Sequence, residues 1–286
     1  MSRIKSFLLS VSILTMLSSC KNAADSETMQ PYNNVVVQKQ STSNTKTPSN
    51  IRISDAELRA IGCRIYINEC SGKPENLAYW NPKEPFPSMG IAHFIWYSTN
   101  YDRPRGDSFS KMLIFYEENG IKLPNWIKKT NYKCPWTTRN AFYKDFNSSH
   151  MRYLRDLLKN TMHLQAKFVI TRFQEKVERV FQSPKTPQMK KHVQYQFYRV
   201  AQSPMGLYAL IDYVNFKGGG TMNSGNWGLL QVLENMKGVG TGKQAVIEFA
   251  NSAKTVLKKR VDQSKNKSTE EKNLYGWYKR IDTYYQ

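Results

Sequence analysis

The residue with the clearest chemical potential in this chain is Glu69, near the end of an expected helix. The segment SDAELRAIGCRIYINECSGK, residues 54–73, predicts an amphipathic helix with Leu58, Ile61 and Ile65 along one face. Glu69 follows Leu58 by about 1100° of rotation at ~100° per residue, so it lies on the same apolar face. Burial and the negative helix C-terminus both favour the protonated carboxyl group. A carboxyl group in this position can act as a general acid.

Local signals define the elements that position Glu69. Ser54 and Glu57 form an S-x-x-E capping box, which predicts the helix start. Ser71-Gly72 and Pro74 predict that the helix ends just beyond Glu69. Residues 86–97 are rich in aromatic and branched side chains and predict a short β-hairpin.

The remainder of the chain is expected to be helical. Periodic apolar residues predict one long helix, or two nearly continuous ones, and a second S-x-x-E box at Ser268 and Glu271 predicts the start of the last helix. The expected helices cover residues 107–119, 149–182, 188–202, 204–214, a segment that begins near 226, and two C-terminal segments. The sequence therefore predicts a mainly α fold with a small β-hairpin, of the α+β class.

The N-terminus has the layout of an export signal. Arg3 and Lys5 precede the apolar run FLLSVSILTML, which is too short to span a bilayer and is typical of a secretory signal. The tetrapeptide LSSC that ends at Cys20 resembles a bacterial lipobox. This resemblance implies that Cys20 carries a lipid anchor in the membrane. Lys21 follows Cys20, and in the known sorting pattern that residue implies the outer membrane, facing the periplasm, with surface exposure left open.

Three segments follow from these signals. Residues 1–19 are the expected signal peptide, 20–50 the lipid anchor and a flexible tether, and 51–286 a single, mainly helical domain. The net charge of +20 falls to +18 when the two basic residues of the signal peptide are removed. This charge favours contact with anionic polymers or lipid headgroups. The lipoprotein signal, in contrast, places the chain away from nucleic acid.

Cysteine and motif counts exclude several other functions. With Cys20 lipidated, three cysteines remain, so at most one intrachain disulfide is expected, with Cys134 bound to Cys63 or Cys70. The four histidines are dispersed and show no metal-ligand spacing, and no G-x-S-x-G nucleophile motif occurs. GVGTGKQ at 238–244 lacks two residues of a phosphate-binding loop. The sequence therefore predicts neither a metal nor a cofactor.

Three short motifs resemble those of one superfamily. NECSGKP at 68–74 resembles the start of the soluble lytic transglycosylase motif, in which a glutamate at a helix end is the acid. SMGIAHF at 88–94 resembles the hairpin that follows the catalytic glutamate of phage-type lysozymes. WGLLQVL at 227–233 is similar to a helix start that lines the transglycosylase cleft. All three belong to the lysozyme-like superfamily of peptidoglycan-cleaving glycosidases, although the distance from Glu69 to the last motif implies a large helical insertion.

The resemblance implies a set of site residues. Glu69 would be the general acid and base, Ser88 takes the place of the hairpin threonine, and Asn81 stands nearest to the position of a second carboxylate. Glu84, Asp102 and Asp107 are other candidates for that carboxylate. The remaining expected residues bind substrate: Trp80, His93, Tyr97, Trp227 and Gln231.

The resemblance also implies a function. We expect a muramidase or a lytic transglycosylase whose partner is the glycan strand of peptidoglycan, since transglycosylases act with one glutamate and attack by the 6-hydroxyl group of the sugar. The alternative is a non-catalytic lipoprotein that binds peptidoglycan or has a structural role in the envelope. In that case Glu69 is a buried glutamate satisfied by a neighbouring arginine or backbone group.

Overall fold

The structure is a computed structural model that describes residues 53–101, 107–221 and 227–286. The expected signal peptide, Cys20 and the tether up to residue 50 lie outside the described residues. The fold is mainly α with a small antiparallel sheet, as the sequence predicts. The elements are α2 (Asp55–Cys70), η1 (Pro74–Leu77), β1 (Ala78–Tyr79), β2 (Ser88–Met89), β3 (Phe94–Ile95), α3 (Ser108–Glu118), α4 (Asn125–Lys128), α5 (Arg139–Lys144), α6 (Ser149–Asn160), α7 (Met162–Gln182), α8 (Pro187–Ala201), α9 (Gly206–Lys217), α10 (Leu229–Asn235), α11 (Lys243–Asp262) and α12 (Lys267–Asp282).

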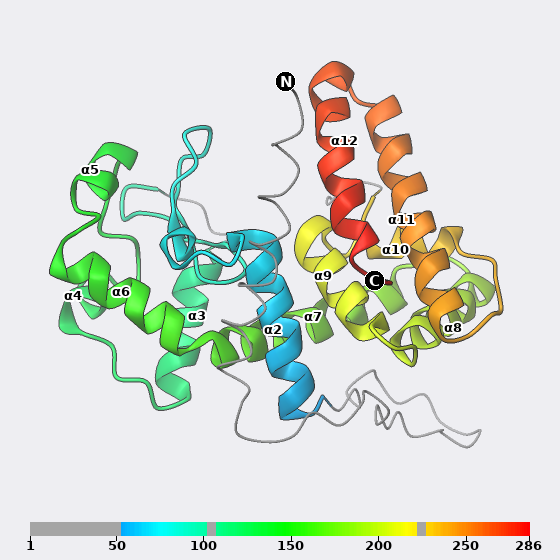
Figure 1. Ribbon diagram of the computed structural model, residues 1–286, viewed down its shortest axis with the longest axis horizontal. Helices are drawn as coiled ribbons and strands as arrows, with labels where there is room; N and C mark the ends of the chain where they lie inside the picture. Colours follow the sequence, from blue (N-terminus) through cyan, green and yellow to red (C-terminus); the bar gives the residue numbers. More distant parts are fainter. Residues whose placement is uncertain (1–52, 102–106, 222–226) are drawn as a thin grey trace, which may run out of the picture.

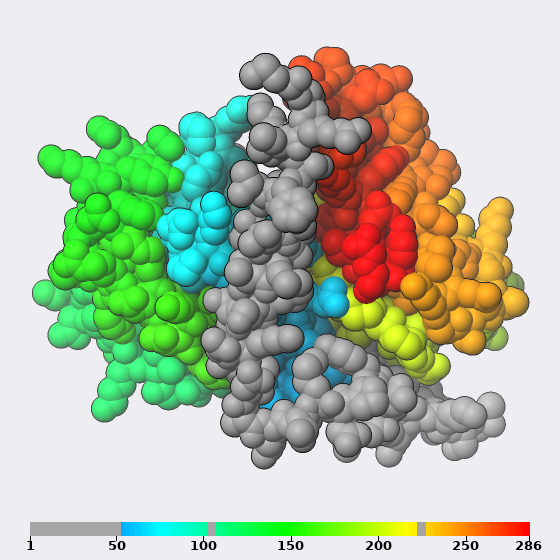
Figure 2. Space-filling view, viewed as in Figure 1, coloured from blue at the N-terminus to red at the C-terminus, as the bar shows by residue number. Residues whose placement is uncertain are grey.

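Helix α2 lies at the centre of the molecule, between two groups of elements (Figure 1). The sheet and α3 to α6 lie on one side, and α8 to α12 lie on the other. Figure 2 shows these groups as the cyan-to-green and yellow-to-red surfaces at opposite ends of the molecule. The expected capping box closes the N-terminus of α2. The Ser54 hydroxyl and the Glu57 carboxylate each accept a hydrogen bond from the other residue's backbone N–H. At the other end, Ser71 adopts a left-handed conformation that terminates the helix just after Glu69.

Helix α7 joins the two groups because it packs against α2, α3, α8, α9 and α10. Its contact with α2 is close, since a Cβ atom added at Gly62 would lie 2.9 Å from the Ala166 Cβ. The periodicity over 149–182 is divided into α6 and α7 at Thr161. The buried Thr161 hydroxyl donates to the Leu157 carbonyl and lies 2.6 Å from the Tyr116 hydroxyl, so a polar contact occupies the junction.

The sheet has the strand order β1-β2-β3, with both pairs antiparallel. Ser88 pairs with Tyr79 on one side and with Ile95 on the other. The expected hairpin within 86–97 is therefore present as β2 and β3. Strand β1 was not predicted, because a strand of two residues is too short to leave a sequence pattern. The turn after β2 is braced by the buried Gln165, whose Oε1 atom accepts from the Ile91 backbone N–H at 2.8 Å.

Helix α9 is the buried core of the second group, and residues 206–214 are all buried. α11 and α12 form a helical pair beside it (orange and red in Figure 1). The last helix begins at Lys267 with Asn266 as its N-cap, and no cap hydrogen bond from Ser268 is present. The S-x-x-E box expected at Ser268 was therefore wrong, because the N-cap of the helix lies two residues earlier. A single hydrophobic cluster extends through both groups.

The close approach of α2 and α7 predicts the effect of a larger side chain. We expect Gly62→Val to lower the free energy of unfolding by about 1–3 kcal/mol, because overpacking pushes α2 away from α7. As a control, Gly276→Ala in α12 meets no atom within 4 Å and should raise it by up to about 1 kcal/mol through helix propensity. Urea unfolding of both variants measures the difference; equal effects would show that the α2–α7 contact is not tight.

Candidate functional site

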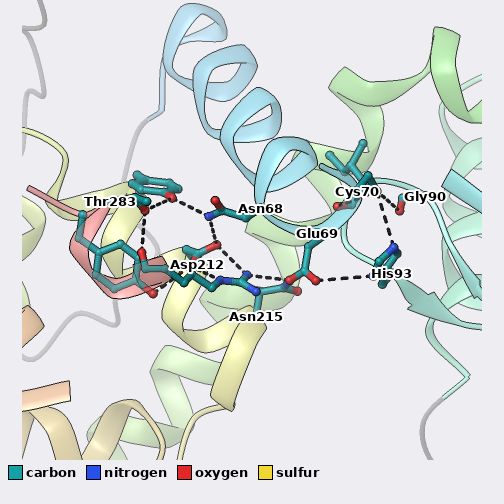
Figure 3. Close-up of polar contacts among 12 residues, drawn as sticks. Asn68, Glu69, Cys70, Gly90, His93, Asp212, Asn215 and Thr283 are labelled. Carbon is teal, nitrogen blue, oxygen red and sulfur yellow. Dashed lines mark hydrogen bonds and ion pairs between the residues drawn. The ribbon is translucent and has the colours of Figure 1, made fainter. Parts of the chain in front are cut away.

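Glu69 lies between the two groups of elements and contacts residues from both (Figure 3). Its Oε1 atom accepts from Arg280 Nη2 at 2.6 Å and from Asn215 Nδ2 at 3.3 Å. Its Oε2 atom lies 3.6 Å from His93 Nδ1. The Glu69 side chain is 17% exposed, and two protein donors hold its Oε1 atom.

The guanidinium of Arg280 is shared between two carboxylates. Besides Glu69, it donates to both oxygens of Asp212, at 2.9 Å each. Asp212 is fully buried and also accepts from Asn68 Nδ2 at 3.2 Å and from the Tyr284 hydroxyl at 2.8 Å. Burial acts to lower the pKa of Arg280, but the charges of Asp212 and Glu69 outweigh burial and raise this pKa above its usual value. Arg280 therefore stays charged.

The ion pair between Glu69 and Arg280 forms at the inward-facing end of α2. The apolar face of α2 directs the Glu69 side chain inward, where it contacts the guanidinium of Arg280. Counted as ions, Glu69, Asp212 and Arg280 carry a formal net charge of −1, and Asp212 has no exposed surface.

His93 is brought to Glu69 by a strained turn. Its φ of 47° lies in the left-handed region, which is uncommon for residues other than glycine, and its backbone N–H donates to the Gly90 carbonyl. The imidazole Nε2 atom lies 3.3 Å from the Asn76 carbonyl oxygen, while Nδ1 faces Glu69. A non-glycine residue in this conformation is held by its surroundings, and such positions often occur at functional sites.

Cys70, His93 and Glu69 form a line that resembles a cysteine–histidine–acid relay, with 3.7 Å between Cys70 Sγ and His93 Nε2. The thiol, however, is fully buried. Burial, and then the charge of Glu69, raises the pKa of Cys70 to about 12. Because the thiolate is the nucleophilic form, this thiol is not an activated nucleophile.

Ser88 is placed near this cluster by strand pairing. Residues directly opposite one another in an antiparallel pair have their side chains on the same sheet face, so Ser88 shares a face with Tyr79. The Tyr79 ring stacks on the His93 ring at 6.5 Å between centroids. Ser88 thus lies on the strand next to Tyr79, whose ring stacks on His93.

Three other expected residues lie elsewhere, with no contact to Glu69 in the described residues. Trp80 is buried against Phe142 and donates to the Glu84 carbonyl. Asn81 closes the turn after β1, because its Oδ1 atom accepts from the Lys83 backbone N–H. Tyr97 is buried and stacks on the Tyr101 ring.

Gln231 lies in the first turn of α10, and Trp227 lies two residues before this helix. Gln231 accepts from the Gly228 N–H and donates to the Gly220 carbonyl, both at 3.0 Å. Gly220 has a φ of 74°, and a Cβ atom there would lie 2.1 Å from Gln231 Oε1, so the approach requires glycine. The Trp227 ring is half-buried beneath the Arg260 guanidinium, at 4.2 Å.

The candidate second carboxylates do not join Glu69. Glu84 is exposed in the turn after β1, and Asp102 lies outside the described residues. Asp107 caps α3 by accepting from the Ser110 N–H, and burial raises its pKa. Asp212 is the carboxylate that the described contacts connect to Glu69, through Arg280.

Cys70 and Cys134 are both free and buried. The disulfide expected between Cys134 and Cys63 or Cys70 was therefore wrong. Cys134 Sγ lies against the Trp136 carbonyl oxygen instead, and burial raises the pKa of its thiol above its usual range.

Two half-buried lysines, Lys217 and Lys176, lie near Asn215 and form no ion pair within the described part of the chain. Burial, then the positive charges of Arg260 and Arg280, lowers the pKa of Lys217 to about 7. Burial and its arginine neighbours lower the pKa of Lys176 to about 8. Lys176 and Asn215 line the same small pocket, together with Phe94, Val169, Arg172, Phe173, Ile211 and Val214.

A larger pocket of about 180 Å³ lies between α2 and the α8–α9 connection, and Glu69 lines neither pocket. The wall of the larger pocket includes Arg64 and Tyr208, and Tyr208 is connected to Asn68 by a hydrogen bond of 2.8 Å.

Within the described ranges, no group of three or more His, Cys, Asp or Glu side chains is suited to a metal ion. No described helix is both long and apolar enough to cross a bilayer.

Comparison of the chain with protein-family models, curated proteins and solved structures finds no significant match.

Sequence reasoning missed most of the groups that surround Glu69. Asp212 had a signal, because it is a lone acidic residue within the apolar segment GLYALIDYV of α9. Asn215 and Lys217 had none beyond their position before the glycine-rich loop. Arg280 is separated from Glu69 by 211 residues, so no local pattern could pair them. Trp277, whose ring contacts Lys217, likewise had no distinguishing signal.

The shared guanidinium predicts a large effect on stability. We expect Arg280→Met to lower the free energy of unfolding by about 3–5 kcal/mol, because it leaves the buried Asp212 without a counter-charge. The control is Lys254→Met, which removes an ion pair to Asp282 with side chains 24% and 31% exposed and should cost at most about 1 kcal/mol. Urea unfolding compares the two; similar small losses would mean that Asp212 does not depend on Arg280.

The lowered pKa of Lys217 predicts a pH-dependent difference in stability. The unfolded chain keeps this proton up to its ordinary pKa of 10.5, whereas the folded chain loses it near 7. The unfolded state therefore binds more protons between these values, and folding stability rises with pH there. We expect the unfolding free energy of the unsubstituted protein, minus that of Lys217→Met, to increase from pH 7 to pH 9. A flat difference would show that Lys217 titrates normally.

Proposed function

We propose that this protein is a peptidoglycan-cleaving glycosidase of the lysozyme-like superfamily, anchored as an outer-membrane lipoprotein facing the periplasm, with Glu69 as its general acid and base. The observation that supports it most is the placement of Glu69. The carboxyl group lies at the end of α2 between the sheet and the α9–α12 group, with Oε1 held by Arg280 and Asn215 and Oε2 facing His93. The superfamily motifs at 68–74 and 88–94 supply this carboxyl group and the histidine.

The proposed reaction begins with proton transfer from Oε2 of Glu69 to the glycosidic oxygen, while the bond from C1 to that oxygen breaks. Positive charge develops at C1. The 6-hydroxyl group of the same sugar then attacks C1, and its proton returns to Glu69. The product is a 1,6-anhydro sugar. Arg280 and Asn215 position the carboxyl group by holding Oε1 throughout.

We prefer the transglycosylase reaction to hydrolysis because no accessible second carboxylate lies beside Glu69 in the described residues. A retaining or inverting hydrolase requires a second carboxylate that reaches the sugar or its water. Asp212 is the carboxylate connected to Glu69, and it is buried with hydrogen bonds to both oxygens. Asn81 and Ser88, the positions suggested by the resemblance, carry no carboxyl group. An internal nucleophile on the substrate removes the need for one.

A second candidate is a protein that binds peptidoglycan without cleaving it. The contacts of Glu69 with Arg280 and Asn215 favour this alternative, because they also describe a structural glutamate satisfied by neighbours. The aromatic faces of Trp227 and Trp277 would still contact sugars in such a protein. The two candidates differ in whether soluble fragments are released.

The test is digestion of purified peptidoglycan. We expect the unsubstituted protein to release muropeptides with anhydro ends, and Glu69→Gln to lower that rate by about 10²–10⁴-fold, the usual contribution of a general acid. The amide keeps an oxygen for Arg280, so folding should be preserved. Glu118→Gln, on the exposed side of α3, is the charge-matched control and should retain the rate.

Mass spectrometry of the fragments decides among the outcomes. Reducing ends in place of anhydro ends would indicate a hydrolase and contradict the transglycosylase step. Wall sedimentation with the protein but without soluble fragments would favour the binding protein. Equal release by Glu69→Gln and the unsubstituted protein would exclude Glu69 as the acid.

A further inference from the structure

We propose that the half-buried ammonium group of Lys217 is an anion-binding subsite beside Glu69, which takes a carboxylate or phosphate group carried on a sugar of the glycan. This inference rests on the proposed function and narrows its substrate to glycans with acidic substituents. It is carried by the arrangement of cations and aromatic rings at the C-terminal end of α9.

Cations and rings alternate in this region. The Arg260 guanidinium lies between the Trp227 and Trp277 rings, at 4.2 and 5.2 Å from their centroids. Lys217 Nζ lies between the Trp277 and Phe216 rings, at 3.4 and 4.0 Å. The series continues through Arg280, which lies 4.4 Å from the Phe216 centroid and contacts Glu69. The ladder formed by these six side chains thus leads directly to the candidate acid.

Lys217 differs from the other two cations of this ladder because it forms no ion pair with any residue that the structure describes. Arg260 forms an ion pair with Glu270 at 2.9 Å, and Arg280 forms two with Asp212 and Glu69. No carboxylate or carbonyl oxygen in residues 53–101, 107–221 or 227–286 accepts a hydrogen bond from Lys217 Nζ. The ring faces attract the cation but leave its N–H donors unused.

The ammonium group is available to a ligand. Every fully buried side-chain nitrogen or oxygen in the described part of the chain has a hydrogen-bond partner. Because Nζ of Lys217 has no such partner there, it is not sealed in the core. Lys217, Trp277 and Trp227 are each half-buried, so each residue keeps some surface in contact with solvent.

The electrostatics favour an anion at this position. Burial, Arg260 and Arg280 together lower the pKa of Lys217 to about 7, while Glu270 opposes them. An anion that contacts Nζ would supply the missing counter-charge and favour the protonated amine. Binding should therefore be strongest below pH 7 and weaken as Lys217 loses its proton.

The rings indicate that the anion is attached to a sugar. Flat aromatic faces such as those of Trp227 and Trp277 pack against the apolar faces of sugar rings. A free inorganic anion would use Lys217 but not these surfaces. Asn215, two residues before Lys217 on α9, contacts Glu69, so one glycan can reach both groups.

Tryptophan fluorescence titration at pH 6 tests the subsite with matched probes. The disaccharide of N-acetylglucosamine and N-acetylmuramic acid carries a carboxylate, and chitobiose is its neutral counterpart. N-acetylglucosamine 6-phosphate and N-acetylglucosamine form the phosphate pair. We expect the unsubstituted protein to prefer at least one acidic member by about tenfold, the value of a charge-assisted hydrogen bond. Which pair shows the preference identifies the anion.

Three variants separate the role of Lys217 from general effects. Lys217→Met should abolish the acidic preference while leaving affinity for the neutral member unchanged, and Lys217→Arg should retain the preference. Lys176→Met is the matched control, because this half-buried lysine also has a lowered pKa but lies outside the ladder. For the unsubstituted protein, the preference should decline between pH 6 and pH 8.5.

The outcomes distinguish this inference from the proposed function. Equal affinity for acidic and neutral members, an unchanged preference in Lys217→Met, or no binding of any probe would each overturn the subsite. If anhydro muropeptides are still released in that case, the proposed function stands without it. If the acidic preference depends on Lys217 but no fragments are released, the subsite stands and the catalytic proposal fails.

Discussion

The ion pair between Glu69 and Arg280 connects the first described helix to the last one. Arg280 is held in turn by Asp212, which is fully buried in α9. A buried carboxylate is tolerated only when charges and hydrogen bonds compensate it, and Arg280, Tyr284 and Asn68 supply that compensation. The position of α2 relative to α9 and α12 therefore depends on this cluster, and so does the position of the candidate acid.

The surroundings of Glu69 restrict the chemistry available there. The neighbouring thiol of Cys70 is kept protonated by burial, so the apparent cysteine–histidine–acid line does not provide a nucleophile. Asp212 is connected to Glu69 but is sealed from solvent. One partly exposed carboxyl group, a histidine in a strained turn and the half-buried Lys217 remain. The proposed function assigns proton transfer to that carboxyl group.

Much of the local structure could be predicted from the sequence. The capping box at Ser54, the helix end beyond Glu69, the hairpin and the mainly helical fold follow from short-range signals, and the structure confirms them. The same type of signal failed at Ser268, where α12 begins one residue before the expected cap. The disulfide expected at Cys134 also failed, because cysteine counts do not reveal which thiols the core separates.

The sequence by itself determined that Glu69 faces inward, because the rotation of a helix depends only on residue spacing. It also named His93 as a substrate-binding residue through a resemblance to a known hairpin, and the structure places this histidine 3.6 Å from Glu69. Only the tertiary structure decided that Arg280 and Asn215 hold the carboxyl group and that Lys217 lies between two aromatic rings. The physical reason is that these contacts join residues that are more than a hundred positions from Glu69 or on separate helices. Such contacts arise from the packing of whole helices, which leaves no periodic trace in either segment.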